Sequence, residues 1–374
     1  MDFQFTEEQD AIREAATGII EGMVTPDRVA EIEATEDRFD RQLWAALAAG
    51  DLLGFGIPEA DGGNGGGMVE IGQILEVQGR SVAPVPLHAT LVAGALPIAR
   101  FGGEALRERW LPGVTSGDVV LTAALADPAF SPSLLPKVRA SGSGGSYVLE
   151  GTASAVPFAH VANAVVVPAR VGDDVVVVVV ALDDPTISVE RVVTTNRAVH
   201  PNVTFSGTAV DADSVLGGSE VLEAALAWAQ TGLALIQVGV CDAALEQTAA
   251  HLNERTQFGR TLSSFQGTML RAADAGIDAE AIRVTAWQAA WRLDESKPAR
   301  EAVLIAKWQA ADRGQRVVHA TQHLHGGTGA DIGYPIHRYF LWGKQIEMEL
   351  GAPSLQLSRL GGLIAEHPEE VIAR

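Results

Sequence analysis

The chain has 374 residues, of which 47% are apolar, and its formal net charge is −20. This apolar content excludes a disordered protein, and the length is sufficient for two or three packed domains. The strong negative charge argues against general nucleic-acid binding and against an anionic membrane surface, although local arginines and backbone N–H groups can still hold an anionic cofactor.

The cysteine count and the first residues indicate the cellular setting. A single cysteine, Cys241, excludes an internal disulfide and any cysteine metal cluster, so no metal site is expected. The start, MDFQFTEEQ, is acidic and lacks the basic and apolar regions of a signal peptide. No apolar stretch approaches the length of a membrane span. These features predict a cytosolic protein that does not enter a membrane.

Residues 1–118 have the pattern of an α-helical domain. Thr6 and Gln9 form a capping box, and helices are expected at 41–50, 68–82, 87–102 and 104–111. The glycine-rich segment 57–65 resembles a phosphate cradle. It is predicted to be a plain loop, because no strand precedes it and no Lys-Ser/Thr pair follows it.

The pattern changes to strands and then back to helices. Residues 119–218 contain short Val, Ile and Thr runs at 147–149, 164–167, 175–182, 187–193 and 202–205, which predict a middle antiparallel β domain, a sandwich or an open barrel. Residues 219–374 contain long apolar-periodic segments at 222–253, 265–293, 301–324 and 334–350, which predict a four-helix bundle. The expected fold class is therefore α+β, in three domains.

Two helix ends carry the residues of chemical interest. The first, residues 251–266, contains Arg255, whose planar guanidinium fits phosphate oxygens, and Phe258, whose ring offers a flat face for a base. The second, residues 320–330 (the glycine corner), contains Gly326, Gly327 and Gly329, where no side chain intrudes on an anion. Taken alone, the first segment also fits an ordinary helix end with Gly259 as its stop.

Together these corners resemble the flavin-binding corners of the acyl-CoA dehydrogenase family. The R-x-x-F-G motif, the F-Q that follows it and the G-G-x-G motif are all present, and His323 stands where many relatives have a glutamine that contacts the cofactor. The resemblance implies that these residues hold the adenosine and pyrophosphate end of an FAD lying largely in a neighbouring subunit. The implied cofactor-binding residues are Arg255, Phe258, Phe265, Gln266, His323, Gly326, Gly327 and Gly329.

The residues at the family's catalytic positions are of a different chemical type in this chain. The family removes an α-hydrogen of an acyl-CoA thioester with a carboxylate base, and its two base positions correspond to Leu350 and Ala229, neither of which accepts a proton. Glu349 lies next to Leu350, but on a helix it would point about 100° away. The hydroxyl and the aromatic residue that contact the flavin ring correspond to Ala126 and to the segment 155–157, which ends in Pro157. No catalytic residue is therefore assigned.

The combination of one intact and one degraded half-site resembles the non-catalytic subunit of actinobacterial heterotetrameric (α2β2) acyl-CoA dehydrogenases of steroid side-chain β-oxidation. This resemblance implies an FAD shared with a catalytic partner subunit, an acyl-CoA bound mainly by that partner, and an external electron acceptor such as an electron-transfer flavoprotein. Two alternatives stay open. One is a self-sufficient homo-oligomeric dehydrogenase whose displaced base is Glu347, Glu349 or Asp127; the other is a flavin-free scaffold protein of the same fold.

Overall fold

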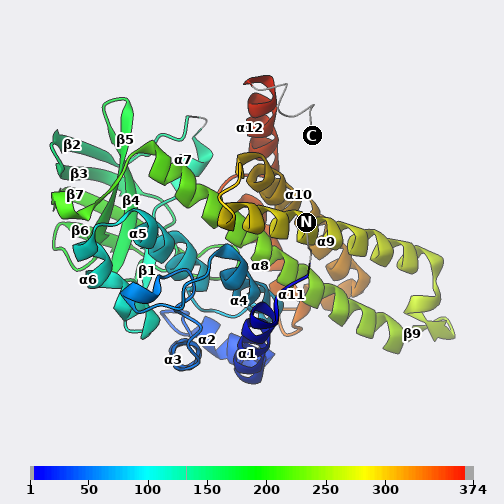
Figure 1. Ribbon diagram of the computed structural model, residues 1–374. Coiled ribbons are helices and arrows are strands. Elements are labelled where there is room, and N and C mark those ends of the chain that lie inside the picture. The colour runs from blue at the N-terminus through cyan, green and yellow to red at the C-terminus, as the bar shows by residue number, and fades with distance from the viewer. Residues whose placement is uncertain (1–3, 132, 367–374) are drawn as a thin grey trace.

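The computed structural model describes residues 4–131 and 133–366, and its element order is helices, strands, helices, as predicted (Figure 1). The capping box is confirmed, because the Gln9 N–H donates to Thr6 Oγ1 and the Thr6 N–H donates to Gln9 Oε1. The segment 57–65 is a loop with one 3₁₀ turn, Glu59–Asp61. The first helices are α1 (Glu7–Met23), α2 (Pro26–Ala34), α3 (Arg41–Ala49), α4 (Met68–Ser81), a π-helical segment (His88–Ala95), α5 (Leu96–Phe101) and α6 (Glu104–Thr115).

The strands form one eight-stranded sheet, in the order β6-β7-β3-β2-β4-β5-β8, with β1 paired to β4. Most neighbours are antiparallel, whereas β1 and β2 each pair with β4 in parallel. A short helix, α7 (Ala126–Phe130), follows β1. The strands are β1 (Leu121–Ala123), β2 (Arg139–Ser143), β3 (Ser146–Ala153), β4 (Ala164–Val171), β5 (Asp174–Ala181), β6 (Ile187–Glu190), β7 (Asn202–Val210) and β8 (Val215–Gly217).

The continuous valine runs of β4 and β5 are explained by burial on both faces of the sheet. Val166 of β4 and Val177 of β5 face the large core shared with the helices. Their neighbours Val165 and Val178 face a second core between the strands themselves. Successive side chains therefore still point to opposite faces of the sheet. Every position is nevertheless apolar, because both faces exclude water.

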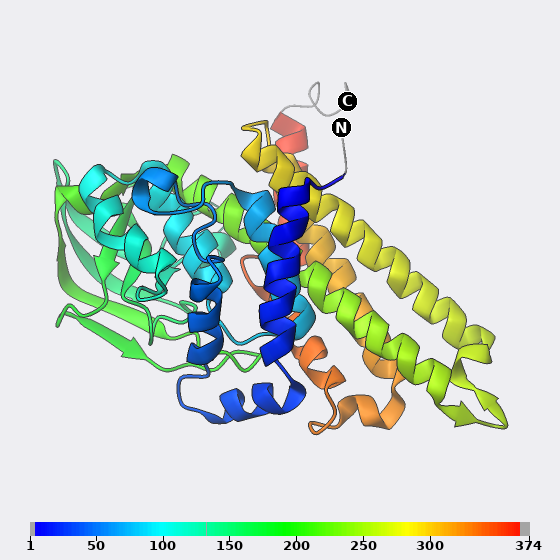
Figure 2. The same ribbon diagram turned by 60° about the horizontal axis from the view of Figure 1, so that its bottom comes forward.

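The C-terminal helices form the predicted bundle, which extends away from the sheet (Figures 1 and 2). By length and composition α8 could cross a membrane, but 83% of its most apolar window is buried, as in the core helix of a soluble fold. The helices are α8 (Ser219–Glu254), α9 (Gln266–Asp294), α10 (Arg300–Leu324), α11 (Ile336–Met348) and α12 (Pro353–Glu366).

Candidate functional site

Residues 251–266, which we call the hairpin corner, form a two-stranded turn between α8 and α9. Helix α8 ends at Glu254, and the strands β9 (Thr256–Gln257) and β10 (Arg260–Thr261) pair across a two-residue turn. Phe258 and Gly259 form that turn with φ of 52° and 78°, the signs that a type I′ hairpin turn requires. The alternative in which Gly259 stops the helix is wrong, because the helix has already ended five residues earlier. Phe258 is thereby carried to the tip.

The side chains of this corner are available to a ligand. Phe258 is 92% exposed. Arg255 is exposed, and its guanidinium makes no ion pair or hydrogen bond with any residue in the described ranges. The Phe265 ring lies 3.9 Å from the Arg260 guanidinium and 6.4 Å from the Phe258 ring. Gln266 is exposed at the first turn of α9. The corner thus presents an exposed cation and an exposed aromatic ring within four residues of each other.

The glycine corner is tight on one side and open on the other. Helix α10 ends at Leu324, and residues Gly326–Ala330 form a 3₁₀ turn that Gly326 enters with φ of 63°. A Cβ on Gly329 would lie 2.3 Å from the Gln322 carbonyl oxygen, so only glycine fits there. A Cβ on Gly326 or Gly327 would meet no atom within 4 Å. The backbone at these two positions is therefore open to an approaching group.

Two stacked histidines join the corners. The rings of His251, at the end of α8, and His325, at the end of α10, are 4.3 Å apart. His325 Nε2 lies 3.2 Å from Thr248 Oγ1, whose hydroxyl donates to the Ala244 carbonyl, so we assign the His325 proton to Nε2. Burial, and then the nearby His251, lower the pKa of His325 to about 4. This neutral pair fixes the two corners relative to each other, a role that sequence reasoning missed.

His323 and Gln322 divide the roles that one glutamine has in related sequences. The Gln322 side chain donates to the Gly329 carbonyl at 3.2 Å, which makes it a structural residue of the glycine corner. His323 is exposed, one turn before Gly327. Of the two, only His323 has a side chain that is free to contact a cofactor.

The two positions expected to correspond to the family's bases, Ala229 and Leu350, lie far from the corners. Ala229 is fully buried within α8, and Leu350 is 5% exposed. Helix α11 ends at Met348, Glu349 is extended, and Leu350 has a left-handed φ of 54°. The expectation that a helix turns Glu349 about 100° away from Leu350 is therefore wrong, because neither residue is helical.

Three buried donors hold the Leu350 loop. Gln230 and Gln356 donate to the Leu350 carbonyl at 2.9 and 3.0 Å. Lys307 donates to the carbonyls of Ile346 and Gly351 at 2.9 and 3.1 Å. Burial lowers the pKa of Lys307 to about 7, although the charges of Glu349 and Glu347 oppose that shift. The loop is thus fixed in place while its base position carries an alkyl chain.

The positions that the family resemblance assigns to the flavin ring and to the base surround one cavity. We call it the larger cavity, to distinguish it from a smaller neighbouring cavity. Its volume is about 170 Å³, below the roughly 300–1,000 Å³ of typical cofactor and ligand sites. Alanine and proline offer no hydroxyl and, at Pro157, no N–H to a ring. Glu349 also lines this cavity, and its Oε2 accepts from Gln345 Nε2 at 3.0 Å. The cavity-lining residues at the expected flavin-ring and base positions are Ala126, Ala155, Pro157, Ala229 and Leu350.

These two regions differ in their fit to FAD. The corner residues, with a free guanidinium, an exposed ring and open glycine backbone, fit the adenosine and pyrophosphate end. The larger cavity does not fit the ring.

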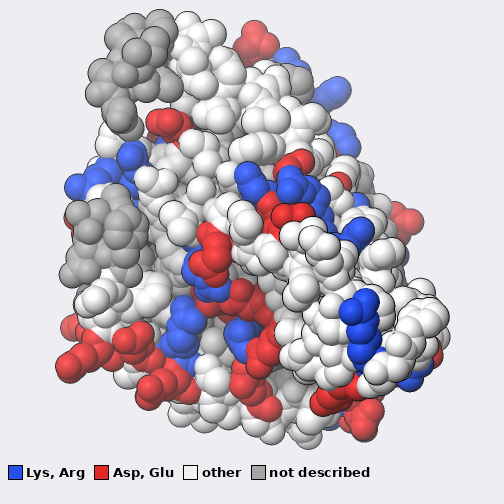
Figure 3. Space-filling model, turned by 90° about the vertical axis from the view of Figure 1, so that its right-hand side faces the viewer, with Lys and Arg blue, Asp and Glu red and all other residues white. Residues whose placement is uncertain are grey.

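On the end of the bundle seen in Figure 3, basic and acidic side chains are interspersed. Local groups, and not a broad basic field, would therefore select an anion. Within residues 4–131 and 133–366, no group of three His, Cys, Asp or Glu side chains could hold a metal.

Comparison with known sequences defines the class of protein. Residues 6–118 match the acyl-CoA dehydrogenase N-terminal domain, and residues 217–361 match the acyl-CoA dehydrogenase C-terminal domain. The chain is 36% identical to acyl-CoA dehydrogenase FadE27 of Mycobacterium tuberculosis, over 98% of this chain and 100% of that protein. It is 32% identical to FadE28 of the same organism, over 96% and 98%. The chain therefore belongs to the acyl-CoA dehydrogenase family.

Solved structures of relatives share the whole fold. The ChsE4–ChsE5 complex from Mycobacterium tuberculosis contains a chain 36% identical to this one, with a TM-score of 0.93 over 98% of this chain and 99% of that chain. A variant of the Tcur3481–Tcur3483 steroid acyl-CoA dehydrogenase contains a chain 42% identical, with a TM-score of 0.91 over 97% and 99%. The predicted family and fold class are confirmed.

Proposed function

We propose that this chain is the non-catalytic subunit of a heterotetrameric acyl-CoA dehydrogenase and completes the FAD site of a catalytic partner. One observation carries the proposal: the free hairpin and glycine corners coexist with a cavity that has Ala229 and Leu350 at the family's base positions and a volume below that of a typical cofactor site. The heteromeric relatives named above support it. The partner would hold the ring, the base and most of the acyl-CoA, which is a steroid side-chain thioester by analogy with those relatives.

The corner residues would bind the tail of the shared FAD by ordinary contacts. Arg255 pairs with pyrophosphate oxygens, and the exposed Phe258 ring, supported by Phe265, packs on the adenine. The open backbone at Gly326 and Gly327 admits phosphate, with Gly329 fixing the turn. Gln266 and His323 donate hydrogen bonds from the helix ends on either side. FAD, when bound, supplies the hydride acceptor for α,β-dehydrogenation.

The complex would work in the cytoplasm and pass its electrons to an external acceptor such as an electron-transfer flavoprotein.

Flavin content tests the proposal. The chain is purified alone and together with a candidate catalytic subunit of the same family, and FAD is quantified by absorbance. We expect FAD and turnover only in the complex. Arg255→Ala should lower the FAD content of the complex, whereas Arg271→Ala, which removes another exposed cation from α9, should not. Yellow, active protein obtained from this chain alone would refute the proposal. Unchanged FAD in the Arg255→Ala complex would favour the flavin-free scaffold.

One observation favours the second candidate, a self-sufficient enzyme with a displaced base. Glu349 lines the larger cavity beside Leu350. The other two carboxylates are engaged elsewhere: Asp127 accepts from the Ser154 N–H and pairs with Lys137, and Glu347 pairs with Lys344. Dehydrogenase turnover by the isolated chain that disappears in Glu349→Gln would establish this function.

A further inference from the structure

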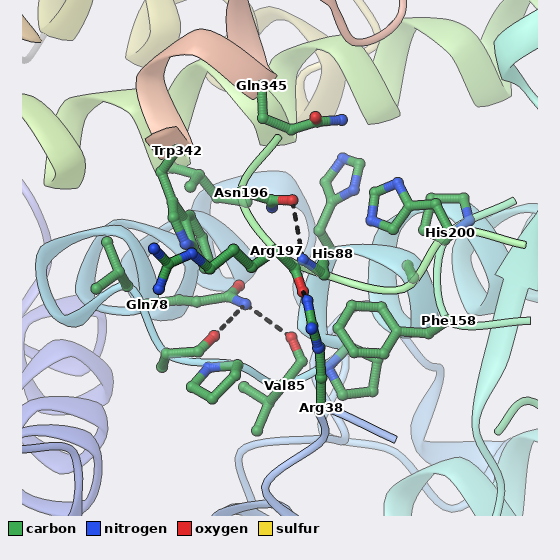
Figure 4. Close-up of a pocket in the computed structure, with 18 of the residues that line it drawn as sticks. Arg38, Gln78, Val85, His88, Phe158, Asn196, Arg197, His200, Trp342 and Gln345 are labelled. Atoms are coloured by element: carbon green, nitrogen blue, oxygen red, sulfur yellow. Dashed lines mark hydrogen bonds between the residues drawn. The ribbon is translucent and has the colours of Figure 1, made fainter. Parts of the chain in front are cut away.

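A smaller cavity adjoins the larger one (Figure 4). Nine of its 23 lining residues are polar, and the lining residues come from positions between 29 and 349. Its volume is about 70 Å³, and it shares His88, His200, Gln345 and Glu349 with the larger cavity. Figure 4 shows Gln345 on one side and Arg38 on the opposite side, with His88 between them. Both cavities together offer room for several water molecules, and hence for a ligand of roughly five to eight non-hydrogen atoms.

Residues with uncommon backbone conformations are frequent in the walls of these two cavities. Of the ten non-glycine residues with positive φ in the described ranges, six line the two cavities. A π-helical segment, a rare element, begins at His88. Strained backbone of this kind gathers at ligand sites, since packing alone does not require it. The six residues are Arg38, Val82, Ala155, Phe158, Arg197 and Leu350.

One end of the smaller cavity presents hydrogen-bond acceptors and a negative charge. Glu349 brings its carboxylate, bonded on one oxygen to Gln345. His88 Nε2 lies 2.8 Å from the Ala229 carbonyl and must donate to it, so His88 Nδ1 is an acceptor. His200 is 5% exposed, and its ring has no hydrogen bond to any described residue. Burial lowers the pKa of both histidines, which keeps them neutral.

Gln78 adds a further acceptor that has no partner. Its Nε2 donates to the carbonyls of Ala83 and Val85, at 3.2 and 2.8 Å (Figure 4). Its Oε1 is buried without a hydrogen bond, in a side chain that is 3% exposed. A buried acceptor left in this state costs about 1–3 kcal/mol, which a ligand donor would recover.

The other end of the smaller cavity carries an excess of positive charge. Arg38 Nη1 donates to the Arg197 carbonyl at 2.7 Å, while Arg38 Nε is buried without an acceptor. Arg197 pairs with Glu33 at 2.9 Å, and Arg338 uses the same carboxylate at 3.2 Å. Burial, and then the charges of Arg191 and Arg197, lower the pKa of Arg38. Arg38 and Arg197 line this end together with one acid, Glu33, and Arg338 pairs with that acid from outside the cavity. The charges at this end therefore leave room for a second anion.

We propose that this polarised cavity binds a small zwitterion, an α-amino acid with a short side chain, with its carboxylate at Arg38 and its ammonium at Glu349. Trp342 and Phe158, which also line the cavity, supply aromatic faces suited to an ammonium group. Lys307 does not compete for Glu349, because its hydrogen bonds are directed to backbone carbonyls. The proposal goes beyond the FAD-completing role and does not depend on it.

Ligand binding to the full chain, in complex with its partner, tests this proposal. Glycine, L-alanine, propylamine and propionate are titrated at constant ionic strength, by calorimetry and by thermal denaturation. We expect the two amino acids to bind and to raise Tm with increasing concentration, and the singly charged probes to bind at least tenfold more weakly. Absence of any amino-acid effect, or equal binding of propylamine or propionate, would overturn the proposal.

Charge-neutralising variants locate the site. Glu349→Gln and Arg38→Gln should each weaken amino-acid binding at least tenfold. The matched controls, Glu31→Gln and Arg41→Gln, remove exposed charges outside the cavity and should leave binding unchanged. Because Arg38 also supports the Arg197 backbone, circular dichroism checks its fold, and Glu349→Gln alone remains decisive. Unchanged amino-acid binding in Glu349→Gln would contradict the assignment.

Discussion

Substitution of two neighbouring glycines by alanine should separate packing from accessibility at the glycine corner. At Gly329 the new Cβ would lie 2.3 Å from the Gln322 carbonyl oxygen, whereas real Cβ contacts essentially never fall below 3.0 Å. The turn must therefore move away from α10, which also weakens the 3.2 Å hydrogen bond from Gln322 to the Gly329 carbonyl. At Gly327 the new Cβ meets nothing within 4 Å and the backbone needs no left-handed conformation.

The magnitudes follow from this geometry. Overpacking of a tight site costs about 1–3 kcal/mol, so Gly329→Ala should lower the free energy of unfolding by that amount. Gly327→Ala should stay within about 0.5 kcal/mol of the original chain, as exposed substitutions do. Urea denaturation followed by far-UV circular dichroism measures both. Equal unfolding free energies for the two variants would refute the assignment of Gly329 as a packing residue. Under the proposed function, Gly329→Ala should also lower the FAD content of the complex.

Three further outcomes are expected. Between pH 6.5 and about 4, His325 is protonated in the unfolded chain and neutral in the folded chain, so stability should fall by roughly 1–3 kcal/mol as pH decreases through this window. His325→Gln should remove that part of the pH dependence in denaturation curves. Asp294 accepts from the Met68 and Val69 N–H groups at the start of α4, so Asp294→Ala should cost about 1–2 kcal/mol in the same assay. Phe258→Ala should change stability by less than about 0.5 kcal/mol, because the ring is 92% exposed, yet lower the FAD content of the complex.

Long periodic segments were predictable from the sequence, and local exceptions were not. The bundle helices follow from apolar spacing over many residues. The sequence pattern predicts no strand at β2, because glycine and serine at 141–146 weaken the strand signal. Backbone pairing with β3 from Arg139 to Ser143 nevertheless makes a strand there, and only the turn at Gly144 and Gly145 remains a tip.

The location of Glu349 shows a limit of helical reasoning. A helix through residue 350 places Glu349 away from the cavity, and the apolar periodicity gives no reason to end the helix earlier. The helix ends at Met348 because distant donors, Gln230, Gln356 and Lys307, bind the carbonyls that follow. Tertiary hydrogen bonds therefore determine where the Glu349 carboxylate points. The sequence around residue 349 does not reveal those hydrogen bonds. The smaller cavity could not be predicted from the sequence for the same reason, because His88 and His200 belong to no common sequence motif.

Helix α8 explains how one half of a cofactor site can change while the other half is kept. Ala229 and Gln230 lie at the larger cavity, and Thr248 and His251 lie at the corners. At 1.5 Å per residue, the two regions are about 30 Å apart along one continuous helix. Substitutions separated by more than about 10 Å act on stability almost independently. Under the proposed function, loss of the base and of the ring contacts would therefore leave the geometry of the corners intact, and the chain could still present its corners to a partner.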